Sequence, residues 1–425
     1  MEKYDVIIVG AGAAGLYAAK LLADAKKNIC LLEARDRIGG RIHTIKRTGF
    51  KIPIEAGAEF IHGKLPITLK LLKEAGIKYH ETKGLLWQVK DNQLKERTDF
   101  VEHADELFKQ LKKLKEYISV SGFLNKYFPD EKYNDMKSSL KQYIQGYDAG
   151  DIDDFSSLAL KEEWEEEDDQ QYRIEGGYGL LLHYLADSIK EHCSLKLFSV
   201  VKQVNWRNDH VEIITGDKKL FFAEKVIITV PLPFLYNNGA EAGISFYPPL
   251  PEIATAASSI GYGGVIKIIL EFDHPFWDTD KLEKAKNLSF IFSDKMVPTW
   301  WTQLPDKTAR LTGWLAGPNA SKFANNSDDE ILDIGLKSLS SIFDLQQEVL
   351  QSYLTGHHIH NWVKDQYCLG GYSYMSLSSK ASKEKFYSPI ADTIYFAGEA
   401  FTKKSNATVE AAFESSKLIA EKILS

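Results

Sequence analysis

Three glycines near the start of the chain have the spacing of a dinucleotide-binding turn. Gly10, Gly12 and Gly15 follow the β-rich run Y-D-V-I-I-V and open a helical pattern that includes Ala14. In such a turn the first glycine permits the tight bend, the second lets the backbone approach a pyrophosphate, and the third lets the helix pack on the strand. The free N–H groups at the start of the helix favour the phosphates.

A carboxylate follows these glycines at the distance that a ribose contact requires. Glu33 lies 18 residues after Gly15, at the end of a second β-rich run over residues 28–33. A carboxylate there can accept hydrogen bonds from both ribose hydroxyls and would repel a 2′-phosphate, which disfavours NADP. The glycines and Glu33 together predict a dinucleotide site, and they leave NAD and FAD both open.

The elements that must position these residues predict an α/β fold. A strand, a helix and a second strand open the chain, which indicates a parallel sheet. Further strands are expected over 200–206, 210–215, 225–230 and 393–396, with a last helix over about 407–424. Residues 65–170 read as mainly helical, and residues 236–385 mix strands with a helix near 328–343. The chain is expected to pass back and forth between two domains.

Longer motifs carry a family resemblance. Residues 33–41 read E-A-R-D-R-I-G-G-R and strongly resemble the flavin-containing amine oxidase superfamily, which includes monoamine oxidases, polyamine oxidases and lysine-specific histone demethylases. Matching motifs follow in order along the chain: E-A-G-A-E-F-I-H-G at 55–63, a glycine pair at 176–177, V-K-Q-V at 201–204, T-V-P at 229–231, G-G-Y-S-Y at 370–374 and F-A-G-E at 396–399.

The resemblance implies a Rossmann-type FAD-binding domain interwoven with an α+β substrate domain made of a mixed sheet and helices. The expected FAD-binding domain is discontinuous and comprises residues 1–80, 171–235 and 386–425. The expected substrate-binding domain comprises residues 81–170 and 236–385. The FAD would lie extended between the Rossmann unit and the last strand and helix.

The resemblance also assigns cofactor contacts. Arg41 would neutralise the pyrophosphate, the backbone of Val201 would hold the adenine, and Glu399 would bind the ribitol. The backbone N–H groups of Thr408 and Val409 would face the O2 edge of the flavin. The further residues expected at the cofactor are Arg35, Gly40, Gly57, Ala58, Glu59, Phe60 and Trp362. Gly371 stands where mitochondrial monoamine oxidases carry a flavin-bonding cysteine, so the FAD is expected to be non-covalent.

Two residues are expected to act at the reacting centre. Lys267 alternates with Val265 and Ile269 on an apolar strand, and the resemblance places it beside flavin N5 through a water. A lysine on an edge strand that reaches solvent is the alternative explanation. Tyr372 is expected to stand against the flavin face and orient the amine. His62 corresponds to a histidine near the amine in animal polyamine oxidases, although it also reads as a structural residue.

Thr408 departs from many members of the superfamily, which place a second aromatic residue there. A similar threonine or serine occurs in polyamine oxidases and histone demethylases. The sequence therefore predicts oxidation of a primary or secondary amine, polyamine-like or bulky, to an imine or aldehyde, with O2 reduced to H2O2. The alternatives are an L-amino-acid oxidase, for which Arg173 or Arg310 would have to bind the carboxylate, and a flavoprotein scaffold with little turnover.

The composition narrows the partners further. The formal net charge of −7 gives no basic excess, which disfavours nucleic-acid binding. Three widely separated cysteines suggest a reducing compartment, and the absence of a signal peptide or membrane anchor predicts a cytoplasmic protein. His358 and His360 would share one face of a strand, but no metal site is expected. The acidic run over residues 162–169 could attract a polycation, but it reads first as a solvated charged face.

Overall fold

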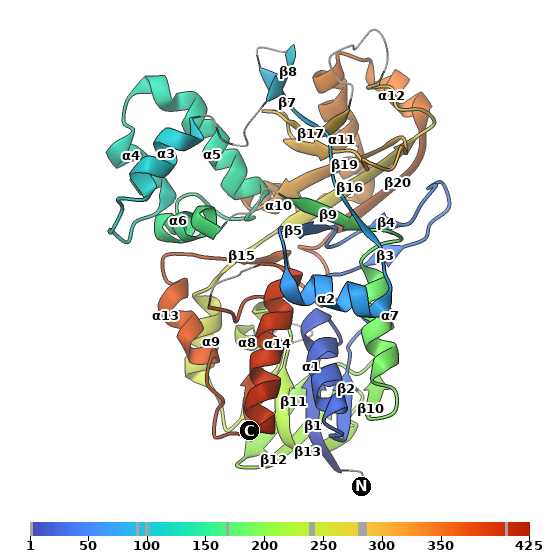
Figure 1. Ribbon diagram of the computed structural model, residues 1–425, viewed down its shortest axis with the longest axis vertical. Coiled ribbons are helices and arrows are strands. Elements are labelled where there is room, and N and C mark those ends of the chain that lie inside the picture. The colour runs from blue at the N-terminus through green and yellow to red at the C-terminus, as the bar shows by residue number, and fades with distance from the viewer. Residues whose placement is uncertain are drawn as a thin grey trace.

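The computed structural model describes residues 3–90, 93–97, 101, 103–166, 170–237, 243–278, 287–403 and 407–425. Two sheets stand one above the other, and a group of helices lies beside the upper one (Figure 1). The chain passes between the two levels several times, so segments from its beginning, middle and end meet where the levels join. No helix among the described residues is both long enough and apolar enough to cross a membrane.

The lower sheet contains the predicted opening strands. Its order is β10-β2-β1-β13-β12-β11-β14, and β22 pairs with β13. The strands β10, β2, β1, β13 and β22 run parallel, whereas β12 is antiparallel to both of its neighbours. The bounds are β1 (Lys3–Val9), β2 (Ile29–Leu32), β10 (Cys193–Lys196), β11 (Val201–Arg207), β12 (His210–Thr215), β13 (Leu220–Ile228), β14 (Ser245–Tyr247) and β22 (Ile394–Phe396).

Both faces of the lower sheet are covered because alternate side chains of β1 enter different cores. Val6 and Ile8 pack with the helices of one face, whereas Ile7 and Val9 belong to the core on the other face. The first face carries α1 (Ala13–Asp24), α2 (Pro66–Ala75), α7 (Gly179–Ser188) and α14 (Val409–Leu424). The second face carries α8 (Pro233–Tyr236) and α9 (Pro251–Ser258).

The upper sheet has the order β20-β16-β19-β18-β17-β7-β8. Every residue of β16 is buried, because this strand lies between two neighbours and under helices. The bounds are β7 (Leu85–Lys90), β8 (Gln93–Arg97), β16 (Val265–Phe272), β17 (Leu288–Phe292), β18 (Thr299–Trp301), β19 (Arg310–Ala316) and β20 (Leu354–Asn361). The covering helices are α10 (Pro318–Phe323), α11 (Asp328–Phe343) and α12 (Gln347–Tyr353).

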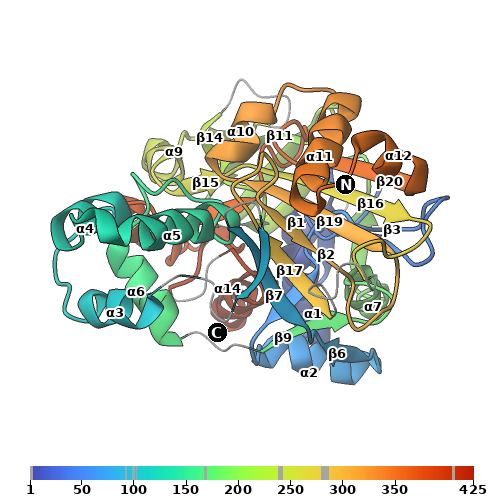
Figure 2. The ribbon, with the colours of Figure 1, turned by 90° about the horizontal axis from the view of Figure 1, so that it is seen from above.

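The helical group beside the upper sheet has a core of its own (Figure 2). It comprises α3 (Ala104–Leu111), α4 (Val120–Tyr127), α5 (Asn134–Gly146) and α6 (Ser157–Glu166). Small sheets join the two levels. One pairs β3 (Thr44–Ile45) with β4 (Ile54–Glu55), and another pairs β15 (Gly261–Gly263) with β21 (Tyr372–Tyr374). A third has the order β5 (Phe60–His62), β9 (Gln171–Ile174) and β6 (Tyr79–Glu81). Helix α13 (Ser379–Lys383) lies near α9.

The predicted fold class is confirmed, with two local differences. The strands β6, β7 and β8 lie inside the range 65–170 that the sequence analysis reads as mainly helical. Short apolar runs such as L-L-W-Q-V fit the periodicity of a helix as well as that of a strand. Here the run forms a strand because it pairs with β17 and β8. In addition, β14 and α9 pack with the lower sheet, so this unit extends beyond residue 235.

Candidate active site

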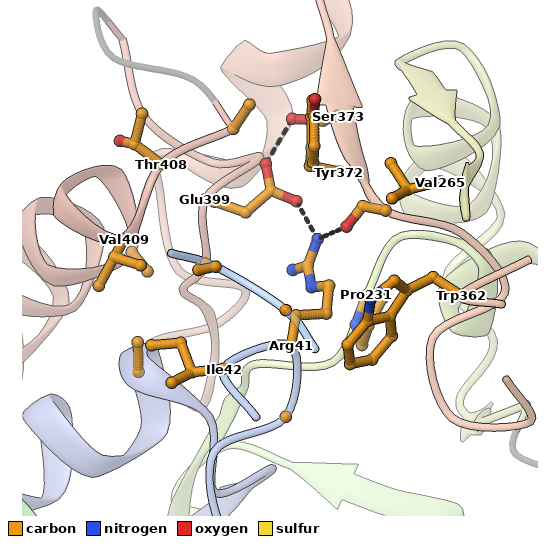
Figure 3. A pocket seen from close by; sticks show the side chains of 18 of the residues that line it. Arg41, Ile42, Pro231, Val265, Trp362, Tyr372, Ser373, Glu399, Thr408 and Val409 are labelled. Carbon is orange, nitrogen blue, oxygen red and sulfur yellow. Dashed lines mark hydrogen bonds and ion pairs between the residues drawn. The ribbon is translucent and has the colours of Figure 1, made fainter. Parts of the chain in front are cut away.

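A large pocket of about 1320 Å³ lies where the two levels join. One end is lined by the glycine turn and Glu33, and the other end by aromatic side chains that include Phe60, Trp301 and Tyr372. Figure 3 shows the middle of the pocket, where Arg41 and Glu399 meet between these ends. The pocket is therefore long enough to join the predicted nucleotide residues with the predicted reacting centre.

The turn between β1 and α1 requires its glycines. Gly10 has a φ of +105°, which disfavours any residue with a Cβ atom. A Cβ atom on Gly15 would lie 1.9 Å from the carbonyl oxygen of Gly10, so helix α1 can approach the turn only with glycine there. Gly10, Gly12 and Ala14 line the pocket. Gly15 lies behind the lining, where close packing of helix and strand needs it.

Glu33 joins the glycine turn to the loop after β2. It is 5% exposed, and its carboxylate accepts hydrogen bonds from the backbone N–H groups of Ala11, at 2.7 Å, and Arg35, at 2.9 Å. The guanidinium of Arg35 forms an ion pair with Asp365 and lies 3.4 Å from the thiol of Cys368. Glu33 and Arg35 both line the pocket. This end of the pocket therefore has a fixed carboxylate beside a fixed cation.

Arg41 and Glu399 form an ion pair in the middle of the pocket. The guanidinium donates to the Glu399 carboxylate and to the carbonyl oxygen of Gly371, each at 2.8 Å (Figure 3). The hydroxyl of Ser373 donates to the other oxygen of Glu399 at 2.6 Å. These contacts connect the motif that ends at Arg41 with the G-G-Y-S-Y and F-A-G-E motifs, which are more than 300 residues away.

The loop Gly57–Phe60 is held close to Arg41 and Trp362. A Cβ atom on Gly57 would lie 1.8 Å from the Arg41 carbonyl oxygen, and the N–H of Ala58 donates to that oxygen at 3.1 Å. The indole N–H of Trp362 donates to the carbonyl oxygen of Ala56 at 2.8 Å. Trp362 and all four loop residues line the pocket.

Lys267 lies inside the upper sheet and not at its edge. Its side chain is 1% exposed, and its ammonium donates to the carboxylate of Glu59 at 2.6 Å and to the carbonyl oxygen of Gly57 at 3.1 Å. The edge-strand explanation is therefore wrong, because β16 has β20 on one side and β19 on the other. Lys267 and Glu59 both line the pocket.

Tyr372 forms part of the same wall. Its hydroxyl donates to the carbonyl oxygen of Tyr147 at 2.7 Å. Burial raises the pKa of Tyr372, and the negative charges of Asp148, Glu399 and Glu163 raise it further. The hydroxyl is therefore neutral and already engaged, so the ring is the part of Tyr372 that a ligand can contact.

His62 lies among aromatic rings. Its ring centroid is 5.3 Å from that of Tyr147 and 5.9 Å from that of Phe60. Burial lowers the pKa of His62 to about 4, so the imidazole is neutral near pH 7. His62 lines the pocket, which agrees with a position beside a ligand.

Several lining residues carry no family motif, and their place in the pocket is not predicted from the sequence. They come from α5, the residues directly after it, α6 and the upper sheet, and only the fold brings them together. The aromatic members include Tyr143, Tyr147, Phe290, Phe292, Trp301 and Trp314. The acidic members are Asp148 and, from the run that was expected to be a solvated face, Glu162 and Glu163. The spacing Y-I-Q-G-Y at 143–147 is the signal that could have placed two tyrosines on one helical face.

Thr408 and Val409 stand at the N-terminus of α14. The hydroxyl of Thr408 accepts a hydrogen bond from the N–H of Ala411 at 3.0 Å, so Thr408 is the N-cap of the helix. Both residues line the pocket, as do the predicted residues Gly40 and Val201. The partial positive charge of the helix N-terminus is thus directed toward the pocket.

The predicted histidine pair lies outside this pocket. On β20 the rings of His358 and His360 are 5.9 Å apart, and His43 is 5.7 Å from His360. Among the described residues no group of three or more histidine, cysteine or acidic side chains could hold a metal ion. Of the acidic run, residues 162–166 lie in α6, and residues 167–169 lie outside the described residues.

Comparison with known proteins decides the family. The model of the flavin-containing amine oxidoreductases matches residues 13–424. The chain belongs to this family. FAD is its cofactor, and the expectation of an FAD-dependent amine oxidase is confirmed.

Individual relatives of this amine oxidase resemble it along nearly its whole length. It is 27% identical to polyamine oxidase 3 of Oryza sativa subsp. japonica, with 98% of this chain and 88% of that protein covered. It is also 27% identical to human lysine-specific histone demethylase 2, with 99% of this chain and 53% of that protein covered. Among solved structures, wild-type putrescine oxidase bound to putrescine has a TM-score of 0.82 at 20% identity, with 100% of this chain and 99% of that chain covered.

A second solved structure gives the same result for the fold. Cyclohexylamine oxidase from Brevibacterium oxydans has a TM-score of 0.80 at 20% identity and full coverage of both chains. The residues of this amine oxidase fit FAD by their own chemistry. Gly10 and Gly15 of the turn leave no room for a Cβ atom, a buried carboxylate follows β2, and the N-terminus of α14 opens on the same pocket.

Proposed function

We propose that this enzyme oxidises a primary or secondary amine that carries a second cationic group or a bulky tail. The amine loses two electrons and two protons and becomes an imine, which water hydrolyses to an aldehyde or ketone, and O2 takes up the electrons and protons as H2O2. The observation that carries the proposal is the continuity of the pocket, which leads from the glycine turn to a chamber with aromatic and acidic walls.

The acidic wall supports an extended cationic substrate. Glu163 accepts a hydrogen bond from the hydroxyl of Tyr143 at 2.7 Å, and the carboxylates of Glu162 and Asp148 line the same chamber. A second ammonium group of a diamine or polyamine gains an ion pair there, and aromatic faces attract cations as well. The names of the relatives, which include polyamine oxidases, point to the same class of substrate.

We assign the two ends of the pocket to different parts of the cofactor. The nucleotide end comprises Gly10, Gly12, Ala14, Gly15, Glu33, Arg35, Gly40, Arg41 and Val201. The flavin end comprises Gly57, Ala58, Glu59, Phe60, Trp362, Glu399, Thr408 and Val409. Bound FAD supplies the two-electron oxidation of the amine. We also propose that the lower sheet with its helices is the FAD-binding domain and that the upper sheet with α3–α6 is the substrate-binding domain.

The amine is positioned by side chains of the chamber. The ring of Tyr372 forms one wall, because its hydroxyl is held by Tyr147. The neutral imidazole of His62 can accept a hydrogen bond from the amine nitrogen. Lys267 supplies a positive charge at the wall of the reacting centre. A bound amine displaces water from the chamber, which strengthens each of these contacts.

The arginines considered for an amino-acid substrate are engaged elsewhere. Arg173 donates to Glu59, Leu304 and Thr302, at 2.7 to 3.1 Å. Arg310 donates to Glu271 and to two backbone carbonyl oxygens. Neither is among the residues that line the pocket. These contacts argue against a carboxylate clamp built from Arg173 or Arg310.

A peroxide-coupled screen tests the proposal. Putrescine, spermidine and spermine are compared with mono-N-acetylated putrescine, benzylamine and L-amino acids, each with and without catalase. Higher kcat/KM for the free diamine than for its acetylated form supports an acidic subsite. A preference for benzylamine would reject the extended substrate. Peroxide formation with amino acids alone would favour the L-amino-acid oxidase. Arg97, which lines the pocket over the ring of Phe292, would then be the candidate to bind the carboxylate.

A further inference from the structure

A single buried carboxylate organises the wall behind the reacting centre. Glu59 is 8% exposed, and its Oε2 atom accepts the 2.6 Å hydrogen bond from Lys267. Its Oε1 atom accepts hydrogen bonds from Arg173 at 3.1 Å, from the indole of Trp301 at 3.1 Å and from the side-chain amide of Gln303 at 3.2 Å. Such complete use of one carboxylate indicates a built position and not an accidental contact.

The Glu59 carboxylate forms ion pairs with two cations, Lys267 and Arg173. Burial raises the pKa of Glu59, but the cations of Lys267 and Arg173 outweigh burial and hold it at about 2. Glu59 is therefore an anion throughout the physiological range. Arg173 is itself held by the carbonyl oxygens of Thr302 and Leu304, so the carboxylate rests on a fixed partner. The remaining oxygen is left to act on Lys267.

We propose that Glu59 is a positioning residue that keeps Lys267 a permanent ammonium at the pocket wall. The ammonium donates to Glu59 and to the carbonyl oxygen of Gly57, and Lys267 also lines the pocket. The inference deepens the proposed function and rests on it in one respect, namely that Lys267 lies beside the reacting centre. It adds the protonation state of Lys267 and the residue that sets it.

The consequence concerns the chemical role of the lysine. Removing a proton from an ammonium 2.6 Å from a buried carboxylate would leave that anion with one partner fewer in a medium of low dielectric constant, which is strongly unfavourable. Lys267 can then donate a hydrogen bond and stabilise negative charge, but it cannot serve as the general base for the amine. The amine must enter neutral or lose its proton to another group.

The first test compares the wild-type holoenzyme with Lys267→Met. The absorbance spectrum of bound oxidised FAD is followed from about pH 6 to 10, since an ionisation beside the flavin perturbs its bands. We expect no transition that the wild type has and Lys267→Met lacks, because the ammonium stays paired with the Glu59 carboxylate at 2.6 Å. Burial raises the pKa of Glu55 to about 7 and the charge of Lys267 lowers it, so Glu55 titrates in both proteins, at a higher pH in Lys267→Met. A transition that is present in the wild type and missing in Lys267→Met would overturn the proposal. This comparison needs no change at Glu59.

The second test removes the anion and keeps its shape. Glu59→Gln should introduce a one-proton transition into the flavin titration, because the ammonium has lost its partner and burial now favours the neutral amine. The double variant Glu59→Gln/Lys267→Met should lose this transition again. A titration of Glu59→Gln that equals the wild type, or a transition that persists in the double variant, contradicts the assignment.

The matched control is Glu271→Gln. Glu271 lies on β16 four residues after Lys267, is fully buried, and pairs with Arg310 at 2.8 Å, but it does not line the pocket. The Glu271→Gln variant therefore measures how much stability is lost when a buried ion pair is broken. We expect this variant to keep the wild-type flavin titration. Since these measurements need bound FAD and no amine, they remain decisive if the peroxide screen rejects the proposed substrate.

Discussion

The hydroxyl of Thr408 accepts a hydrogen bond from the backbone N–H of Ala411, at 3.0 Å, and so caps the helix whose N-terminus lines the pocket. This contact gives Thr408 a structural role in addition to the space that its small side chain leaves. A larger residue at position 408 therefore changes two things at once, and the two effects must be separated by experiment.

Thr408→Tyr should narrow the chamber and shift kcat/KM toward benzylamine-like compounds, because a second ring faces Tyr372. It should also lower the stability by about 1 kcal/mol through loss of the cap. Thr408→Ser keeps a capping hydroxyl and should retain both the wild-type stability and the wild-type preference. Thermal unfolding and kinetics with benzylamine and spermidine measure the two effects. An unchanged preference in Thr408→Tyr would mean that the ring does not reach the amine.

Glu33→Gln should weaken FAD binding roughly 10- to 100-fold, which corresponds to a charged hydrogen bond of about 1.5–3 kcal/mol. The amide keeps the shape but loses one acceptor for Ala11, Arg35 and the ribose. The ratio of flavin to protein absorbance and titration of the apoprotein with FAD give the affinity. Glu224→Gln, at an exposed residue paired with Lys3, is the control and should bind FAD normally.

Glu163→Gln should raise KM for putrescine and spermidine by about tenfold or more, since a lost ion pair with the distal ammonium costs about 1.5–3 kcal/mol. Mono-N-acetylated putrescine should be affected little, because it lacks that charge. Glu165→Gln, on the same helix and not lining the pocket, should behave as the wild type. Equal losses for the free and the acetylated diamine would reject Glu163 as the distal contact.

The FAD should be released by acid precipitation, because position 371 carries no thiol. Cys368 lines the pocket three residues earlier, but burial raises the pKa of its thiol to about 12, so the thiolate is rare at neutral pH. Flavin fluorescence is measured in the supernatant and the pellet for the wild type and for Cys368→Ala. If the flavin stays in the pellet of the wild type but enters the supernatant of Cys368→Ala, it is bonded covalently to Cys368.

Acid should destabilise the fold below about pH 6.5. Burial lowers the pKa of His62, His43 and His358 to about 4 and that of His360 to about 3. The unfolded chain therefore takes up these protons first, and the stability that the neutral histidines provide is complete above pH 6.5 and declines as the pH falls toward 4. Burial raises the pKa of Glu55 to about 7, which acts in the opposite direction but involves one proton against four.

Urea unfolding between about pH 4 and 7 checks the sign of this effect. Each histidine adds at most ~1.4 kcal/mol per pH unit to the slope. His360→Gln should make the decline shallower, whereas His192→Gln, at an exposed position, should leave it unchanged. A slope that is the same in all three proteins would show that the histidine cluster does not control acid stability.

The motifs could be read from the sequence because each depends on a local requirement. Gly10 must adopt a positive φ, Gly15 and Gly57 must admit a carbonyl oxygen, and Glu33 must end a strand. These demands restrict the residue type at fixed spacings along the chain. For the same reason the helix over 328–343 was predicted with its observed bounds, since Ser327 and Glu330 form a capping box.

The rest of the site depends on pairing between distant strands. Glu59 and Lys267 are separated by 208 residues, and their contact requires both β16 and the small sheet of β5 and β9 to be placed first. The same holds for Trp314, which reaches the chamber because β19 pairs with β16 and β18. Spacing along the chain contains no information on such contacts, so residue types alone could not predict the chamber wall.

The repeated passage of the chain between the two sheets affects when FAD can bind during synthesis of the protein. β1 and β22 both pair with β13 in one sheet, although β1 is the first strand along the chain and β22 is the last (Figure 1). A ribosome releases β1 early, whereas β22 and α14, which bring Glu399 and Thr408, emerge hundreds of residues later. The nascent polypeptide therefore lacks part of the pocket throughout most of translation, and we expect FAD to bind only after translation, when binding depends on the flavin supply of the cell.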